Sequence, residues 1–302
     1  MGSLPISIPR TALPIRLPVL WKMYLTARDA FWTPSDINLT VDKEHWAKRL
    51  GGGERQLVSR ALGFFATADG LVTRNIASRL YQEVAYLEAR FFYGFQIVME
   101  NIHAEMYAKL IDTLIPEQVD QEVLFRWSTE VPSIAFKHIW ATKWTVDTSR
   151  SFAERLIAYV CVESVFFSAS FAVLSWFKLQ GKLPGMTRSI DFIVKDESLH
   201  VAFACALLRR LSTRPMAGTV RGIVKAAVKI ETDFAIGDLL TRADSEISLD
   251  DMQSYIRYNA DQLLVNMGYD VAYGDSNPFL FASGILPALL PEELEDEEYA
   301  ET

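Results

Sequence analysis

The sequence predicts an all-helical bundle built as one domain, and three observations carry this prediction. Half of the 302 residues are hydrophobic, which is enough for one large core. Apolar residues recur at helical spacing over long stretches, and Pro and Gly lie mostly between them. Strand signals are scarce, since the hairpin dipeptide Asp69-Gly70 has flanks that do not alternate apolar and polar residues. We therefore expect helices over residues 54–82, 83–114, 151–179, 186–211 and 217–242.

The charge is concentrated at one end of the sequence. Residues 292–302 contain seven acids and no Lys or Arg, and so account for seven of the eight net negative charges. The nearly neutral remainder argues against a nucleic-acid partner. We divide the sequence into an N-terminal extension (1–17), a helical domain (18–273) and a Pro-punctuated, acidic tail (274–302) that we expect to be disordered at its end.

The first expected helix, 54–82, follows a Gly-Gly-Gly run that lacks the Gly-Lys-Ser/Thr of a phosphate loop. Its only acid in apolar surroundings is Asp69, in "FFATADGLV".

The second expected helix, 83–114, contains "ENIHAEMY", in which Glu100, His103 and Tyr107 stand at offsets of three and seven residues. On an α-helix these offsets place the carboxylate, the imidazole and the phenol on one face. Without further information Tyr107 reads as an ordinary core tyrosine.

The third expected helix contains an apolar run, 157–177, that is long enough to cross a bilayer. Glu163 lies inside this run and four serines interrupt it, so we expect a helix buried in a soluble bundle without a membrane partner. A buried, unpaired carboxylate costs on the order of 2 to 7 kcal/mol. Glu163 therefore requires a metal ion or, alternatively, a core Lys or Arg.

The fourth expected helix repeats the acid and imidazole spacing, because Glu197 and His200 in "KDESLH" again stand three residues apart. One such pair is weak evidence, and Asp42 with His45 has the same spacing at what we expect is a solvated helix start. Two copies, each preceded by a lone acid in apolar surroundings, are much stronger evidence.

The order of these residues in the sequence is a lone acid, a pair, a lone acid and a pair. Ferritin-like di-metal bundles use a carboxylate from each of two helices and Glu-x-x-His from each of the other two. The predicted fold class is accordingly a ferritin-like helical bundle with a di-metal carboxylate site, whose metal ligands are Asp69, Glu100, His103, Glu163, Glu197 and His200. Four carboxylates and two imidazoles suit iron or manganese, and no thiolate is present to favour zinc.

Beyond these ligands, the sequence resembles the small, radical-generating subunit of class I ribonucleotide reductase over about residues 21–279. The resemblance is carried by "FWTPSDINL", "FFATADGLV", "EARFFYGFQIVMENIHAEMY", "VESVFFSASF", "LPGMTRSIDFIVKDESLH" and "NPF". It implies a homodimer that works with a large catalytic subunit to convert ribonucleotides to deoxyribonucleotides. The implied cofactor is two iron ions, or a mixed manganese and iron pair.

The resemblance also implies roles for individual residues. Asp69, Glu100 and His103 would hold one metal, and Glu163, Glu197 and His200 the other. Tyr107 would be oxidised to a tyrosyl radical, shielded by an apolar pocket of Phe167, Phe171 and Ile193. Asp196 would connect His103 to Trp32 and carry an electron and a proton toward the large subunit, although Trp32 alone reads equally as an aromatic anchor at a helix end.

One part of the family pattern is missing. "NPF" is normally followed by an Asn-Phe-Phe-Glu motif and a docking tail, whereas this sequence lacks the motif and has a short acidic tail with Tyr299. Tyr299 is a candidate relay residue, or an incidental tyrosine of a solvated tail. The missing motif supports one alternative, a stand-alone di-metal oxidase or oxygenase acting on a small molecule. A further alternative, a metal-binding partner without catalysis, is disfavoured by the intact set of six ligands.

The two cysteines lie in apolar helical patterns without Cys-x-x-Cys, which favours a reducing compartment. No export signal is visible, so we expect a cytoplasmic location.

Overall fold

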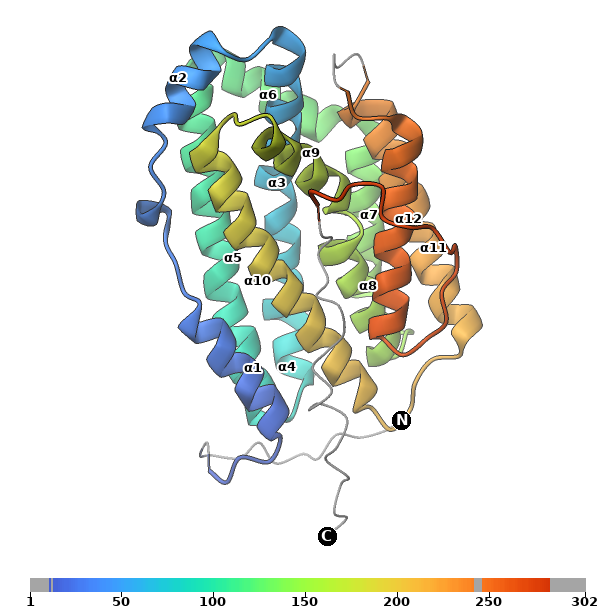
Figure 1. Cartoon of the computed structure of the whole chain (residues 1–302). Helices are drawn as coiled ribbons and strands as arrows, with labels where there is room; N and C mark the ends of the chain where they lie inside the picture. The colour runs from blue at the N-terminus through green and yellow to red at the C-terminus, as the bar shows by residue number, and fades with distance from the viewer. Residues whose placement is uncertain (1–10, 12, 242–245, 283–302) are drawn as a thin grey trace.

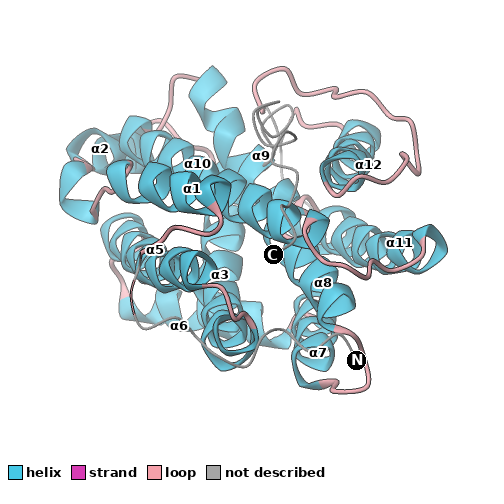
Figure 2. Cartoon of the chain, turned by 90° about the horizontal axis from the view of Figure 1, so that it is seen from below, coloured by secondary structure: helices cyan, strands magenta, loops and turns pink. Residues whose placement is uncertain are grey.

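A computed structural model of the protein describes residues 11, 13–241 and 246–282, except for the side chains of Asp69 and Leu71. Every regular element in this part is helical, as Figure 2 shows, so the predicted helical class is confirmed. The helices are α1 (Pro18–Asp29), α2 (Thr40–Lys48), α3 (Gly52–Asn75), α4 (Tyr81–Glu83), α5 (Leu87–Leu114), α6 (Gln118–Glu130), α7 (Pro132–Val146), α8 (Phe152–Ser164), α9 (Ser168–Leu179), α10 (Pro184–Arg209), α11 (Ala217–Phe234) and α12 (Leu249–Asn266). Short turns complete them: the 3-10 turn η1 (Pro34–Asp36) and the π-helical turns η2 (Ile76–Leu80) and η3 (Ala235–Leu239).

Four long helices form the centre of the bundle. Helix α3 packs on α5, α5 on α10, α10 on α8 and α8 on α3, so they enclose a common interior (Figure 1). Helix α1 covers α5 and α10, while α6 and α7 pack on α3, and α11 and α12 pack on α8. Every helix that carries a predicted ligand belongs to this inner group.

The stretch 151–179, expected as one helix, is two helices with an interruption at residues 165–167. At the interruption the Phe166 carbonyl accepts a hydrogen bond from Lys137 Nζ (2.8 Å), and the Ala169 amide donates to Glu231 Oε1 (3.1 Å). In a continuous helix that amide would donate to the carbonyl four residues earlier. Side chains from α7 and α11 therefore replace the helical hydrogen bonds at the break.

This same stretch, Phe152–Leu179, is long and apolar enough to cross a membrane by length and composition. Its most apolar 18-residue window is completely buried inside the bundle, as expected of a core helix. Helix α8 begins at a capping box, in which Ser151 Oγ accepts the Glu154 amide and Glu154 accepts the Ser151 amide.

The expectation that Asp42 lies at a solvated helix start is wrong, because its side chain is fully buried. Its carboxylate accepts the amides of Gly185 (2.9 Å) and Met186 (2.7 Å) at the N-terminus of α10. A Cβ at Gly185 would lie 2.5 Å from the Asn38 carbonyl oxygen, so only glycine permits this approach. The contact fixes the start of the helix that carries Glu197 and His200.

Candidate metal centre

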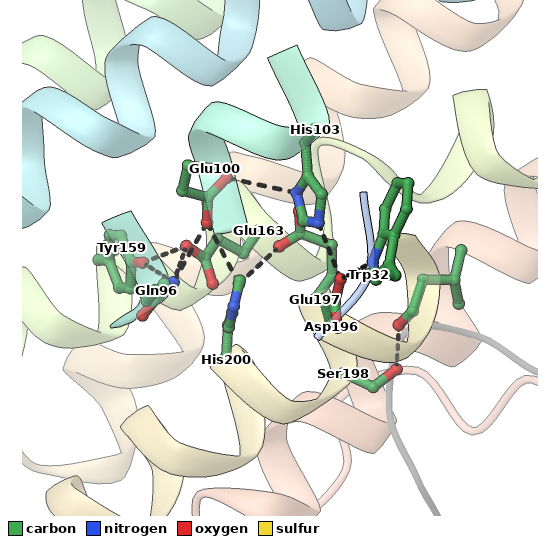
Figure 3. Close-up of polar contacts among 11 residues, drawn as sticks. Trp32, Gln96, Glu100, His103, Tyr159, Glu163, Asp196, Glu197, Ser198 and His200 are labelled. Carbon is green, nitrogen blue, oxygen red and sulfur yellow. Dashed lines mark hydrogen bonds and ion pairs between the residues drawn. The ribbon is translucent and has the colours of Figure 1, made fainter. Parts of the chain in front are cut away.

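Three helices of the inner group bring five predicted ligands together in the buried interior. Glu100 and His103 come from α5, Glu163 from α8, and Glu197 and His200 from α10. Ligand atoms of Glu100, Glu163, Glu197 and His200 all lie within 4.8 Å of one another. Figure 3 shows the side chains converging from their helices. The i and i+3 spacing of each pair explains why both members of the pair reach the same interior.

His103 joins this cluster through its Nδ1 atom. That atom lies 3.1 Å from Glu197 Oε1 and 3.6 Å from Glu100 Oε2. His200 Nδ1 lies 3.2 Å from Glu100 Oε1 and 3.3 Å from Glu197 Oε2. Glu100 and Glu197 therefore each contact both imidazoles and connect the two Glu-x-x-His pairs across α5 and α10. Asp69 lies on α3, but its side chain is outside the described residues.

Several polar atoms of the cluster are buried without a hydrogen-bond partner among the described residues. They are Glu100 Oε2, Glu163 Oε2 and His103 Nδ1. An unsatisfied buried polar atom costs about 1–3 kcal/mol, and more when it is charged. Oxygen and imidazole nitrogen are ligands that iron and manganese accept, so the donor set fits a pair of such ions.

The pKa shifts of the cluster show how strongly it attracts positive charge. Burial, followed by the Glu197 carboxylate, raises the pKa of Glu163 well above its ordinary value. Burial opposes the charge of His200, but hydrogen bonds to Glu100 and Glu197 outweigh it and raise the pKa of His200 to about 10. The same competition raises the pKa of His103, where the hydrogen bond to Asp196 is the largest favourable contribution. The cluster thus holds protons that metal ions would displace.

Asp196 links the cluster to Trp32. Its Oδ2 atom accepts Trp32 Nε1–H at 2.8 Å and lies 3.0 Å from His103 Nε2. The Trp32 and His103 rings are nearly parallel, at 24° with centroids 6.1 Å apart. This contact joins the loop before η1 to α5 and α10, and it orients the His103 ring with Nδ1 toward the other acids (Figure 3).

Tyr107 lies one turn beyond His103 and is buried. Its ring stacks on Phe65, with centroids 4.9 Å apart and planes 3° from parallel. Phe65 in turn contacts Phe167 and Phe171 at 5.5 and 4.6 Å. Ile193 is completely buried. The residues named for the apolar pocket therefore lie in the core, and two of them reach Tyr107 through Phe65.

Two contacts of Glu163 were missed by sequence reasoning. Gln96 Nε2 donates to Glu163 Oε1 at 2.9 Å and to the Tyr159 hydroxyl oxygen at 2.6 Å, and that hydroxyl donates to Glu163 Oε1. Neither donor is cationic, so they do not fulfil the expected alternative of a core Lys or Arg. Each stands four residues before a predicted ligand, Gln96 before Glu100 and Tyr159 before Glu163. That same-face spacing was the available signal.

Fold and site together define a ferritin-like protein with a di-metal type carboxylate and histidine cluster. Comparison with known proteins narrows this class. The family described as "Ribonucleotide reductase, small chain" matches residues 10–278. The protein belongs to this family and is therefore part of an oxidoreductase.

Individual relatives agree with this assignment. A ribonucleoside-diphosphate reductase small subunit from Arabidopsis thaliana is 45% identical over 266 residues, which cover 88% of this protein and 80% of the relative. Subunit M2 from Danio rerio is 42% identical over 272 residues, which cover 90% and 70%. These names favour the reductase over the stand-alone oxidase.

Solved structures give the same fold. The ribonucleotide reductase Rnr4 homodimer from Saccharomyces cerevisiae superimposes with a TM-score of 0.84 at 27% identity, over 90% of this protein and 86% of the yeast one. The dimanganese(II)-NrdF of Streptococcus sanguinis has a TM-score of 0.80 at 20% identity, over 89% and 94%, and supports the fold alone.

Proposed function

We propose that the protein is the radical-generating small subunit of a ribonucleotide reductase, and that Tyr107 is the residue oxidised. One observation carries the proposal: Glu100, His103 and Tyr107 share one face of α5, and all three are buried inside the bundle. The family assignment supports the reaction class.

The ligands divide between two metal positions. Asp69, Glu100 and His103 would hold one ion and Glu163, Glu197 and His200 the other, and Glu100 and Glu197 each contact both imidazoles. We propose iron at both positions, with a manganese and iron pair as the alternative, because the donors accept either ion. When bound, the ions supply the reduction of dioxygen that provides an oxidant for Tyr107. The role of Asp69 rests on the family resemblance.

The protein's own part is to control Tyr107 and its surroundings. In the proposed oxidation the phenol gives up one electron and its hydroxyl proton, which leaves a neutral radical. The stacked Phe65 and the neighbouring Phe167 and Phe171 exclude water and reductants from the ring. A neutral radical persists in such apolar surroundings because reductants cannot reach it.

Trp32, Asp196 and His103 would connect the site to the partner subunit. The carboxylate of Asp196 accepts a hydrogen bond from Trp32 and faces His103, so it holds both rings in fixed orientation. We propose that this contact carries an electron together with a proton between the metal centre and the large subunit.

The proposed assembly is a homodimer that works with a large catalytic subunit on ribonucleoside diphosphates. The related yeast Rnr4 structure is a homodimer, and the curated relatives are named as small subunits of ribonucleoside-diphosphate reductase, which supports this assembly. Tyr299 and the acidic end of the tail lie outside the described residues, so their part in docking stays a prediction. The cytoplasmic location also stays a prediction.

Electron paramagnetic resonance tests the proposal. The protein is loaded anaerobically with ferrous iron and exposed to oxygen, with Tyr107→Phe as the test variant and Tyr93→Phe as the matched control. Tyr93 is a second fully buried tyrosine on α5, one turn before Gln96. We expect a tyrosyl signal in the wild type and in Tyr93→Phe, and none in Tyr107→Phe. Oxygen consumption without a radical in the wild type would refute the role of Tyr107.

A further inference from the structure

Tyr159 gives Glu163 a contact that the proposed reaction does not use. The two residues lie one turn apart on α8, and the phenol is almost completely buried. Its hydroxyl donates to Glu163 Oε1, and the same oxygen accepts Gln96 Nε2 at 2.9 Å. Figure 3 shows Tyr159 and Gln96 at the end of the cluster opposite Trp32 and Asp196.

These two donors make the oxygens of Glu163 unequal. A carboxylate has about four lone-pair positions, two on each oxygen. Both donors point at Oε1, whereas Oε2 is buried and accepts no hydrogen bond from the described residues. Glu163 is also one of the residues whose ligand atoms converge with those of Glu197 and His200. The carboxylate is therefore held by one oxygen and open at the other.

We propose that Tyr159 is a positioning residue that fixes Glu163 so that Oε2 alone is offered to the metal. The inference rests on the proposed metal centre and deepens it by naming what orients one ligand. Without the phenol hydroxyl, Oε1 keeps only the Gln96 donor and the carboxylate can rotate within the cluster. The metal position that Glu163 serves would then be weakened, whereas the position served by Glu100 and His103 would keep its ligands in place.

Tyr93 provides a matched control for this contact. It is also fully buried, and its hydroxyl makes no hydrogen bond with the described residues. Tyr159→Phe and Tyr93→Phe therefore remove the same atom from equally buried rings, but only the first removes a hydrogen bond to Glu163.

Phenylalanine is the right replacement because Tyr159 lines a small hollow. The hollow has a volume of about 100 Å³ and lies between α3, α7 and α8, with Val72, Ala141, Thr145 and Val162 among its lining residues. A smaller side chain would open the cluster to this hollow and would change water access together with the hydrogen bond.

The test is an anaerobic titration of the full-length protein with manganese(II), followed by calorimetry and by the electron paramagnetic resonance of the bound ion. Manganese(II) reports binding without oxygen chemistry. We expect two ions per protomer in the wild type and in Tyr93→Phe. In Tyr159→Phe one binding step should weaken by about 10–100-fold, the range typical for loss of a residue that orients a ligand, while the other step is unchanged. The resonance of the ion at the weakened position should also change.

Different failures have different meanings. A Tyr159→Phe isotherm that superimposes on the wild type overturns the positioning role and leaves the metal centre standing. Equal weakening of both steps together with a lower melting temperature also overturns it, since that result indicates a general loss of stability. A wild type that binds no manganese(II) and no iron(II) refutes the proposed metal centre itself, and the positioning role falls with it.

Discussion

Lys137 on α7 and Glu231 on α11 form a buried ion pair beside the break between α8 and α9, and substitutions of the pair test what stabilises this break. Both side chains are almost inaccessible, at 2% and 0% exposure. The Nζ atom of Lys137 also lies 3.9 Å from the centroid of the Phe64 ring and 3.8 Å from the centroid of the Phe234 ring. Removal of one partner leaves an uncompensated buried charge, which costs about 3–5 kcal/mol. We expect Glu231→Leu and Lys137→Met each to lower the free energy of unfolding by at least this amount, because each also removes the partner of one backbone group at the break.

The double variant Lys137→Met/Glu231→Leu should be more stable than either single variant. Replacement of a whole buried pair by apolar side chains is commonly neutral or stabilising by about 1–4 kcal/mol. Here, however, the Phe166 carbonyl and the Ala169 amide also lose their partners, at about 1–3 kcal/mol each. The net expectation is a loss of roughly 2 kcal/mol, so the two substitutions are strongly non-additive.

Urea unfolding followed by circular dichroism at one fixed protein concentration measures these differences. Single variants that lose less than about 1 kcal/mol would refute the uncompensated-charge argument. A double variant that loses as much as the two single variants together would show that the two residues act independently, against the contact in the structure.

Three further predictions concern the pH dependence of stability, the contact of Asp42 with α10, and the binding of manganese(II). Burial raises the pKa of Glu231 to about 7 and lowers that of Lys137 to about 8. The contribution of Glu231 to the free energy of unfolding is therefore complete below pH 4.5 and is lost as the pH rises through 7. The contribution of Lys137 has the opposite dependence: it is complete above pH 10.5 and is lost as the pH falls through 8. We subtract the free energy of unfolding of the double variant from that of the wild type at each pH. This difference should reach its minimum between pH 7 and 8, and a maximum in that range would contradict the two pKa shifts. Asp42→Ala leaves the buried amides of Gly185 and Met186 without an acceptor, so it should lower the free energy of unfolding, measured in urea, by about 2–4 kcal/mol. A loss below about 0.5 kcal/mol would show that the start of α10 does not need this contact. Manganese(II) at about 100 times its dissociation constant should raise the free energy of unfolding by about 2.7 kcal/mol per site, and an unchanged melting curve would argue against binding to the folded state.

The sequence alone determined the helical class and most of the residues that meet in the buried cluster. Both properties depend on near neighbours: helical hydrogen bonds connect residues four apart, and a Glu and a His three apart share a face in any α-helix. The pairs Glu100 with His103 and Glu197 with His200 could therefore be read directly. The lone acid Glu163 stood out because a carboxylate in an apolar run needs a partner.

Tertiary structure decided which distant groups meet. Trp32 and Asp196 are 164 residues apart in the sequence, and no local pattern makes the indole donate to that carboxylate. The break between α8 and α9 was invisible because Lys137 and Glu231, on other helices, supply its hydrogen bonds. Asp42 was misread for a similar reason, since its partners lie at the start of α10. Burial fixes the energy of such charges and orphaned backbone groups, and burial is known only when the helices are packed together.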